Sequence, residues 1–194
     1  DFITCVLRNS YGLASKLSDI RTIVDVGANA GFFSLAARAR YPDAAIHAYE
    51  PNPRVHRILR ANTAGFDVDV YPEAVGGRCG RVKLIDDGPS NQARVLVEEP
   101  GENTFEVLQV DLGTVLERAG GRIDLLKLDC EGAEWEILQP GMVWQLIRNI
   151  RLEYHLYHGE SAERALRMLT DFGYRILRFE PGHEFGGVIW AAQK

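Results

Sequence analysis

Short apolar runs alternate with amphipathic segments along this chain. Residues 22–26 (Thr-Ile-Val-Asp-Val) form a β-branched run followed by a glycine, which is typical of a fully buried parallel strand. After Gly31, apolar residues recur at helical spacing as far as Tyr41, and Pro42 ends the pattern. Residues 44–49 then repeat the strand pattern. The chain therefore begins as strand, helix, strand.

The same alternation continues to the C-terminus. Asn52 and Pro53 supply a cap and a first-turn proline for a helix that we expect to end near Gly65. Further strands are expected at 67–71, 123–129, 147–155, 174–179 and 186–192, and further helices at 112–118, 133–138 and 161–172. Strands that alternate with helices predict an α/β fold. Its mostly parallel, Rossmann-like sheet should bind ligands outside the carboxyl ends of its strands.

Length and composition indicate one domain spanning residues 1–194. The chain has 194 residues, 46% of them hydrophobic, which suffices for a single sizeable core. We expect residues 1–21 to form a helical lead-in. Residues 76–110 alternate short strands with Gly-, Pro- and Asn-rich stretches, and we expect them to form a strand-and-loop insertion on the substrate side.

Charge and cysteine usage exclude several classes of protein. The formal net charge is −5, so no overall positive field attracts a phosphate backbone, and we expect no nucleic-acid partner. Cys5, Cys79 and Cys130 show no CxxC spacing, which argues against a disulfide framework or a zinc site and favours a cytoplasmic setting. The apolar runs are too short to cross a bilayer, so we expect no membrane association.

A glycine-containing loop follows the first predicted strand. Gly27 and Gly31 leave no Cβ where a ligand and the strand-to-helix turn crowd the backbone, and Asn29 tolerates the unusual dihedrals of such a turn. Asp25 places an acceptor near the loop, which would repel a pyrophosphate and attract an amino group. Because the pattern GxGxxG is absent, the loop disfavours a dinucleotide.

Acidic and polar residues follow the second and third strands. Glu50 stands about 20 residues beyond the loop, where an acidic side chain accepts hydrogen bonds from ribose hydroxyls. Pro51 and Asn52 could flank an adenine ring, and a turn that contains Glu73 and Ala74 could offer main-chain groups to the edge of that ring. Together with the loop, these positions predict a nucleoside-containing ligand.

Three motifs carry a family resemblance: Val-Asp-Val-Gly-Ala-Asn-Ala-Gly at 24–31, Tyr-Glu-Pro-Asn-Pro at 49–53 and Leu-Lys-Leu-Asp-Cys-Glu-Gly-Ala-Glu at 126–134. The chain resembles the FkbM-type methyltransferases over roughly residues 22 to 155. The third motif is the most specific, and Cys130 departs from the valine that is usual in the family. The resemblance implies the seven-stranded class I methyltransferase sheet with a reversed final strand, and S-adenosylmethionine as donor. It also implies a small hydroxylated acceptor, usually a sugar or secondary metabolite. The oligomeric state is not predicted.

Candidate catalytic residues end two neighbouring strands. Asp129 and Glu131 follow one strand, and Glu153 and His155 end the next, so all four should meet at one edge of the sheet beside the cofactor. Asp129 could contact the amino acid portion of the cofactor. His155 is our first choice for general base, because an ordinary imidazole has a pKa of about 6.5, and Glu153, on the same side of its strand, could orient it.

Three alternatives remain open at this point. The chain could be a nucleotide-binding oxidoreductase on a similar sheet, although it lacks the expected glycine pattern. It could also be a non-catalytic partner subunit that keeps the cofactor fold, although its glycine loop is intact. The oxygen and nitrogen ligands at the catalytic rim could instead hold a divalent cation. The family resemblance implies no metal, and we expect none.

Overall fold

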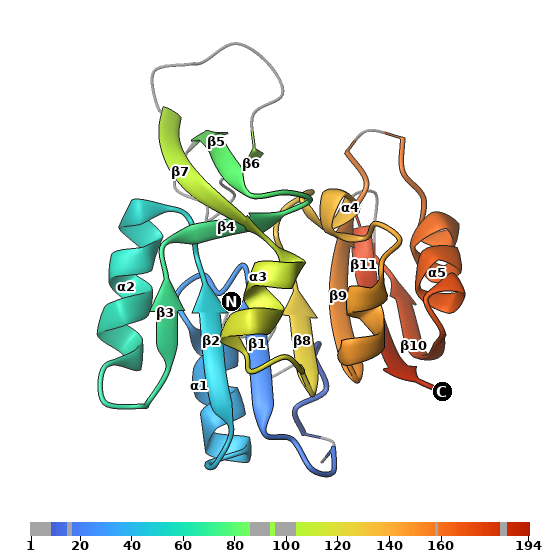
Figure 1. Ribbon diagram of the computed structural model, residues 1–194, viewed down its shortest axis with the longest axis horizontal. Coiled ribbons are helices and arrows are strands. Elements are labelled where there is room, and N and C mark those ends of the chain that lie inside the picture. The colour runs from blue at the N-terminus through green and yellow to red at the C-terminus, as the bar shows by residue number, and fades with distance from the viewer. Residues whose placement is uncertain (1–8, 15–16, 86–93, 96–103, 158, 183–185) are drawn as a thin grey trace.

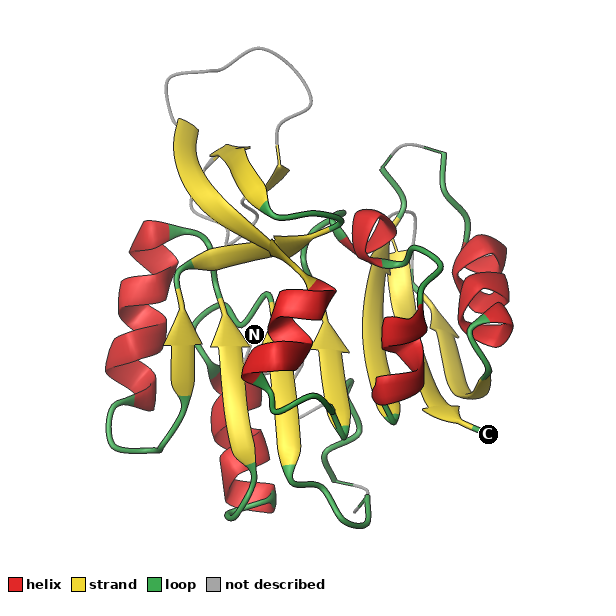
Figure 2. Cartoon of the chain, viewed as in Figure 1, coloured by secondary structure: helices red, strands yellow, loops and turns green. Residues whose placement is uncertain are grey.

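The computed structural model describes residues 9–14, 17–85, 94–95, 104–157, 159–182 and 186–194. These residues form a large sheet with helices on both faces and a smaller sheet above the carboxyl ends of its parallel strands (Figures 1 and 2). The large sheet contains β1 (Thr22–Val26), β2 (Ala45–Tyr49), β3 (Asp69–Tyr71), β8 (Leu125–Leu128), β9 (Asn149–His155), β10 (Tyr174–Pro181) and β11 (Gly186–Gln193).

The strand order of the large sheet is β10-β11-β9-β8-β1-β2-β3. Neighbouring strands from β9 to β3 pair in parallel. The last strand, β11, runs antiparallel to both β9 and β10. The expected seven-stranded, mostly parallel sheet with a reversed final strand is thereby confirmed. Its central strands place their carboxyl ends at one edge, where the predicted site residues lie.

The helices cover both faces of this sheet and enclose two apolar cores. They are α1 (Phe32–Arg40), α2 (Pro53–Thr63), α3 (Leu112–Arg118), α4 (Glu134–Ile137), the 3₁₀-helix η2 (Met142–Leu146) and α5 (Ala162–Asp171). On one face Phe33 of α1 packs with Ile23 of β1. On the other face Val115 of α3 and Leu169 of α5 share a core with Val24. As expected, Asn52 caps α2 by accepting the backbone N–H of Arg54 at 3.0 Å.

The smaller sheet corrects one expectation. Residues 73–75, expected as a turn, belong to strand β4 (Glu73–Gly76), which pairs in parallel with β7 (Thr104–Asp111). With β5 (Gly80–Ile85) and β6 (Arg94–Val95) the order is β4-β7-β5-β6. The buried pair Ala74 and Val75 explains the strand, since these side chains find apolar partners on segments distant in sequence. Most of the described residues in the insertion expected at 76–110 are thus in strands, while 86–93 and 96–103 lie outside the description.

The N-terminal segment also differs from expectation where it is described. Residues 9–14 and 17–21 form turns, bends and irregular chain, with no helix among them, and residues 1–8 and 15–16 lie outside the description. Among the described helices, none combines the length and the apolar character that crossing a membrane requires.

Candidate active site

The glycines of the first loop make room for the protein's own chain. Gly27 has φ +72°, and a Cβ there would lie 1.7 Å from the backbone oxygen of Asp129. Gly31 has φ +88°, and a Cβ would lie 2.8 Å from Cδ1 of Leu59. Asn29 adopts a left-handed conformation, with φ 51°, as expected. The crowding that we attributed partly to a ligand therefore comes, in this structure, from the residue that follows β8 and from α2.

The expected position of Asp25 at the ligand is not what the structure shows. Its side chain is fully buried. One carboxylate oxygen accepts the Ser34 hydroxyl at 2.7 Å, and the other lies 3.1 Å from Nζ of Lys127. Lys127 in turn donates to the backbone oxygen of Gly27 at 2.6 Å. Asp25 therefore neutralises the buried Lys127, whose ammonium group is hydrogen-bonded to the backbone of the glycine loop.

Glu50 lies at the carboxyl end of β2, and each of its carboxylate oxygens accepts a hydrogen bond from a backbone N–H group. It accepts the N–H of Asn29 at 2.9 Å and the N–H of Asn52 at 2.8 Å. Burial raises the pKa of Glu50 to about 7, against the lowering effect of these two hydrogen bonds. Each carboxylate oxygen has a second lone pair, so Glu50 can still accept ribose hydroxyls. Asn52 faces α2 and Glu50, which differs from the adenine contact that we expected.

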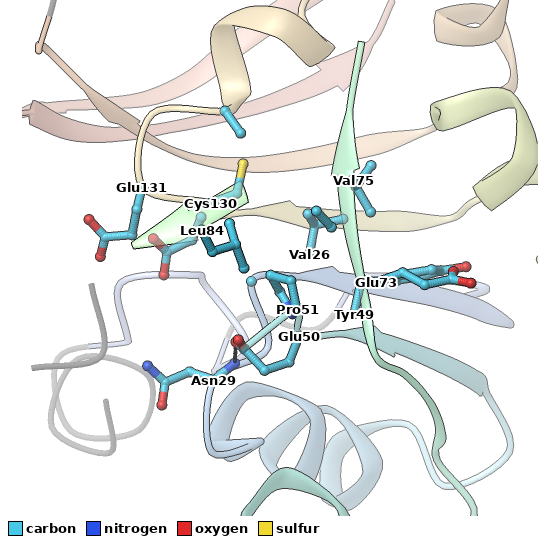
Figure 3. A pocket seen from close by; sticks show the side chains of 14 residues that line it. Val26, Asn29, Tyr49, Glu50, Pro51, Glu73, Val75, Leu84, Cys130 and Glu131 are labelled. Atoms are coloured by element: carbon cyan, nitrogen blue, oxygen red, sulfur yellow. Dashed lines mark hydrogen bonds between the residues drawn. The ribbon is translucent and has the colours of Figure 1, made fainter. Parts of the chain in front are cut away.

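A pocket opens between the carboxyl ends of β1, β2 and β8 and strand β4 (Figure 3). Its empty space is about 610 Å³, including solvent at its mouth. The lining residues are Val26, Gly27, Asn29, Tyr49, Glu50, Pro51, Glu73, Ala74, Val75, Leu84, Asp129, Cys130, Glu131 and Ala133. Most predicted cofactor residues line it, while Asp25, Gly31, Asn52, Glu153 and His155 are not among the lining residues.

Asp129 and Glu153 share a partner that the sequence did not reveal. The hydroxyl of Tyr11 lies 2.8 Å from Oδ2 of Asp129 and 2.6 Å from Oε2 of Glu153. Lys127 approaches the same Asp129 oxygen to 3.5 Å. Burial and the Asp129 charge raise the pKa of Glu153. Glu153 thus contacts Tyr11, in place of the orienting contact with His155 that we expected.

The imidazole of His155 lies between two other carboxylates. Its Nδ1 is 2.7 Å from Oε1 of Glu134, and its Nε2 is 3.5 Å from Oε2 of Glu131. Glu134 is fully buried and also accepts the backbone N–H groups of His155 and Gly132. Burial lowers the pKa of His155, but the hydrogen bond and charge of Glu134 and the charge of Glu131 outweigh it and raise the pKa to about 9.

This pKa removes the reason for choosing His155 as base. A histidine with a pKa near 9 is mostly protonated at neutral pH and has no lone pair for an incoming proton. Glu131 is the better placed group, because it lines the pocket and burial raises its pKa. Tyr157 donates to Oε2 of Glu131 at 3.1 Å, on the same oxygen that faces His155. His155 and Tyr157 therefore orient the Glu131 carboxylate.

Three of these side chains also meet the geometric requirement for a cation site. Ligand atoms of Asp129, Glu131 and His155 lie within 4.8 Å of one another. The cations Lys127 and protonated His155 face this group, and each also faces a buried carboxylate, Asp25 and Glu134 respectively. The geometry alone does not distinguish a metal ion held by these three side chains from the proton that His155 carries.

Comparison with known proteins identifies the family. Residues 25–176 match the family model described as the methyltransferase FkbM domain. The chain is 32% identical to methyltransferase sdnD of Sordaria araneosa, over 80% of this chain and 74% of that protein. It is 29% identical to the 31-O-demethyl-FK506 methyltransferase FkbM of Streptomyces tacrolimicus, over 89% and 78% of the two chains.

Solved structures share the fold. The N-terminal domain of EvdMO1 with bound S-adenosylhomocysteine superimposes with a TM-score of 0.58 at 13% identity, over 96% of this chain and 79% of that chain. A magnesium protoporphyrin IX methyltransferase of Synechocystis with bound S-adenosylmethionine has a TM-score of 0.56 at 13% identity, over 98% and 79% of the two chains. The chain therefore belongs to the FkbM family of S-adenosylmethionine-dependent methyltransferases.

Proposed function

We propose that this chain transfers the methyl group of S-adenosylmethionine to a hydroxyl oxygen of a sugar or other small secondary metabolite. The observation that carries the proposal is the position of Glu131 on the pocket, held by Tyr157 and His155, with a pKa that burial raises. Methylation of a hydroxyl needs a group that takes its proton, and a carboxylate with a raised pKa suits that task. One relative is itself named for a substrate that lacks an O-methyl group.

The pocket combines acidic groups with apolar side chains, which suits the donor. Glu50 can accept the ribose hydroxyls, and Pro51 lines the pocket together with Ala74 and Val75 of β4, where we place the adenine. Asp129, a half-buried residue that lines the pocket, can accept the donor's ammonium group. The donor is a sulfonium with an ammonium, so an acidic group such as Asp129 favours its binding.

In the proposed reaction, one proton passes from the acceptor hydroxyl to a side chain of this protein. When bound, S-adenosylmethionine supplies a methyl group to the acceptor oxygen, and the electron pair of the broken S–C bond stays on its sulfur. Glu131 takes the hydroxyl proton as the new C–O bond forms, which avoids a charged oxonium product. His155 and Tyr157 hold the carboxylate in place for this proton transfer.

A screen of acceptors tests the proposal. The protein would be incubated with methyl-labelled S-adenosylmethionine and a panel of sugars and polyol metabolites, each paired with an analogue in which an amine replaces the hydroxyl. We expect label in the hydroxyl compounds and an O-methyl carbon signal in the NMR spectrum of the product. Exclusive methylation of the amines would contradict O-transfer. Donor binding without turnover of any acceptor would instead support a non-catalytic partner subunit.

A further inference from the structure

The turn around Tyr11 is fixed to the sheet by contacts from β9 and β11. Nε1 of Trp190 donates to the backbone oxygen of Ser10 at 2.7 Å, and Nε of the buried Arg151 donates to the backbone oxygen of Tyr11 at 3.0 Å. A Cβ at Gly12 would approach the Trp190 ring to 2.8 Å, so the turn lies directly against that ring. The position of Tyr11 is therefore determined by contacts of its backbone and neighbours.

The hydroxyl of Tyr11 reaches two carboxyl groups of the site. It lies 2.8 Å from Asp129 and 2.6 Å from Glu153, and the tyrosine is only 2% exposed. A phenol has one proton and can donate it to one acceptor only. Both contacts are hydrogen bonds if one of the two carboxyl groups is itself protonated and donates to the phenol oxygen. Tyr11, Asp129 and Glu153 together then carry one negative charge.

Each carboxyl group has further neighbours. Nζ of Lys127 lies 3.5 Å from the Asp129 oxygen that Tyr11 contacts. Burial and the charge of Asp129 raise the pKa of Glu153, against the lowering effect of the Tyr11 hydrogen bond and of the charges of His155 and Lys127. A proton on Glu153 leaves the Tyr11 hydroxyl free to donate to Asp129.

We propose that Tyr11 is a positioning residue of the active site, whose hydroxyl holds the Asp129 carboxylate in the orientation that receives the ammonium group of the donor. This inference rests on the role proposed above for Asp129. It makes the N-terminal turn a part of the donor site, although no motif of the family resemblance includes it. Substitution by phenylalanine isolates the hydroxyl, because the ring would keep its edge-to-face contact with Phe33 at 5.5 Å.

Two ligands distinguish this role from a purely structural one. S-adenosylhomocysteine has the ammonium group, whereas 5′-methylthioadenosine shares its adenosine and thioether and lacks the amino acid. We expect Tyr11→Phe to lower the affinity for S-adenosylhomocysteine about ten-fold, the effect of losing one hydrogen bond to a charged group. The affinity for 5′-methylthioadenosine should stay the same. Calorimetry on the whole chain measures both.

Tyr41→Phe is the matched control. Tyr41 is 6% exposed, and its hydroxyl accepts the backbone N–H of Leu17 at 3.1 Å, away from the pocket. It should leave both affinities unchanged. An equal loss for both ligands in Tyr11→Phe, or no loss for either, would overturn the inference.

Asp129→Asn separates this inference from the proposal on which it rests. If Asp129→Asn leaves the affinity for S-adenosylhomocysteine unchanged, the ammonium role of Asp129 is wrong, and the inference about Tyr11 is wrong with it. If Asp129→Asn weakens that ligand selectively while Tyr11→Phe does not, only the role of Tyr11 is wrong. Selective weakening by both variants supports both.

Discussion

Oε1 of Glu134 accepts both the backbone N–H and the Nδ1 hydrogen of His155, each at 2.7 Å. The two residues are 21 positions apart, on α4 and at the end of β9. A fully buried carboxylate needs a cation nearby, and here the imidazolium provides it. The same contact turns Nε2 toward Glu131. The pair is thus a structural ion pair that also sets the direction of the proposed base.

Glu134→Gln should lower the pKa of His155 from about 9 toward or below the ordinary value of about 6.5. The reason is that the carboxylate charge disappears while the burial of the ring remains. NMR titration of the imidazole measures this change. Glu136→Gln, at an exposed position of the same helix, is the control and should leave the His155 pKa near 9.

The same pair should give stability a defined pH dependence. A histidine whose folded pKa lies above its unfolded pKa stabilises the fold fully below the unfolded value, and this contribution disappears as pH rises through the folded value. For His155 the window is pH 6.5 to 9, and the contribution is on the order of 3 kcal/mol. Urea unfolding between pH 6 and 9.5 should show this decline in the parent and not in Glu134→Gln. Parallel curves for the two proteins would contradict it.

Gly27→Ala should destabilise the protein more than Gly65→Ala. Both glycines have positive φ, so both substitutions incur strain of about 1–2 kcal/mol. Only at Gly27 would the new Cβ also meet backbone, the oxygen of Asp129 at 1.7 Å, whereas nothing lies within 4 Å at Gly65. We expect a difference of more than about 2 kcal/mol in the free energy of unfolding. Equal losses would mean that the loop relaxes without disturbing β8.

Local patterns predicted the order of elements well, because the periodicity of apolar residues reports which face each segment buries. They failed where a partner far along the chain decides the outcome. Strand β4 was expected as a turn, since its partner β7 begins about 30 residues later. Tyr11 reaches carboxylates 118 and 142 positions away, and no local signal marks it. The pKa of His155 could not be anticipated for the same reason, because Glu134 reaches it through the fold.

Glu50→Ala should weaken the binding of S-adenosylhomocysteine by about 1.5–3 kcal/mol, because two ribose hydroxyls lose a charged acceptor. The parent should also bind this ligand more tightly as pH rises from 6 to 8. The pKa of Glu50 is about 7, and only the ionised form accepts both hydroxyls. Binding below pH 7 should therefore release a proton, which calorimetry in buffers of different ionisation enthalpy detects. An unchanged pH dependence in Glu50→Gln would assign the proton to another group.

The last prediction concerns the proton acceptor. Glu131→Gln should lower the methylation rate by roughly 10²–10⁴-fold and leave the affinity for S-adenosylhomocysteine nearly intact, because only the base has been removed. The pH profile separates Glu131 from His155. The pKa of His155 is about 9, so a rate that needs its neutral form would rise about 25-fold from pH 7.5 to 9.5. A rate that needs ionised Glu131 instead increases as pH rises through the raised carboxyl pKa and then stays level.

We expect the level profile, with activity retained in the presence of a chelator. A steep rise toward pH 9, together with a rate in His155→Ala that falls as far as that of Glu131→Gln, would return the base to the histidine. Loss of activity with the chelator, restored by a divalent cation, would instead place a metal among Asp129, Glu131 and His155, whose ligand atoms lie within 4.8 Å of one another. In that case the cation would lower the pKa of the acceptor hydroxyl, and the carboxylates would act as ligands.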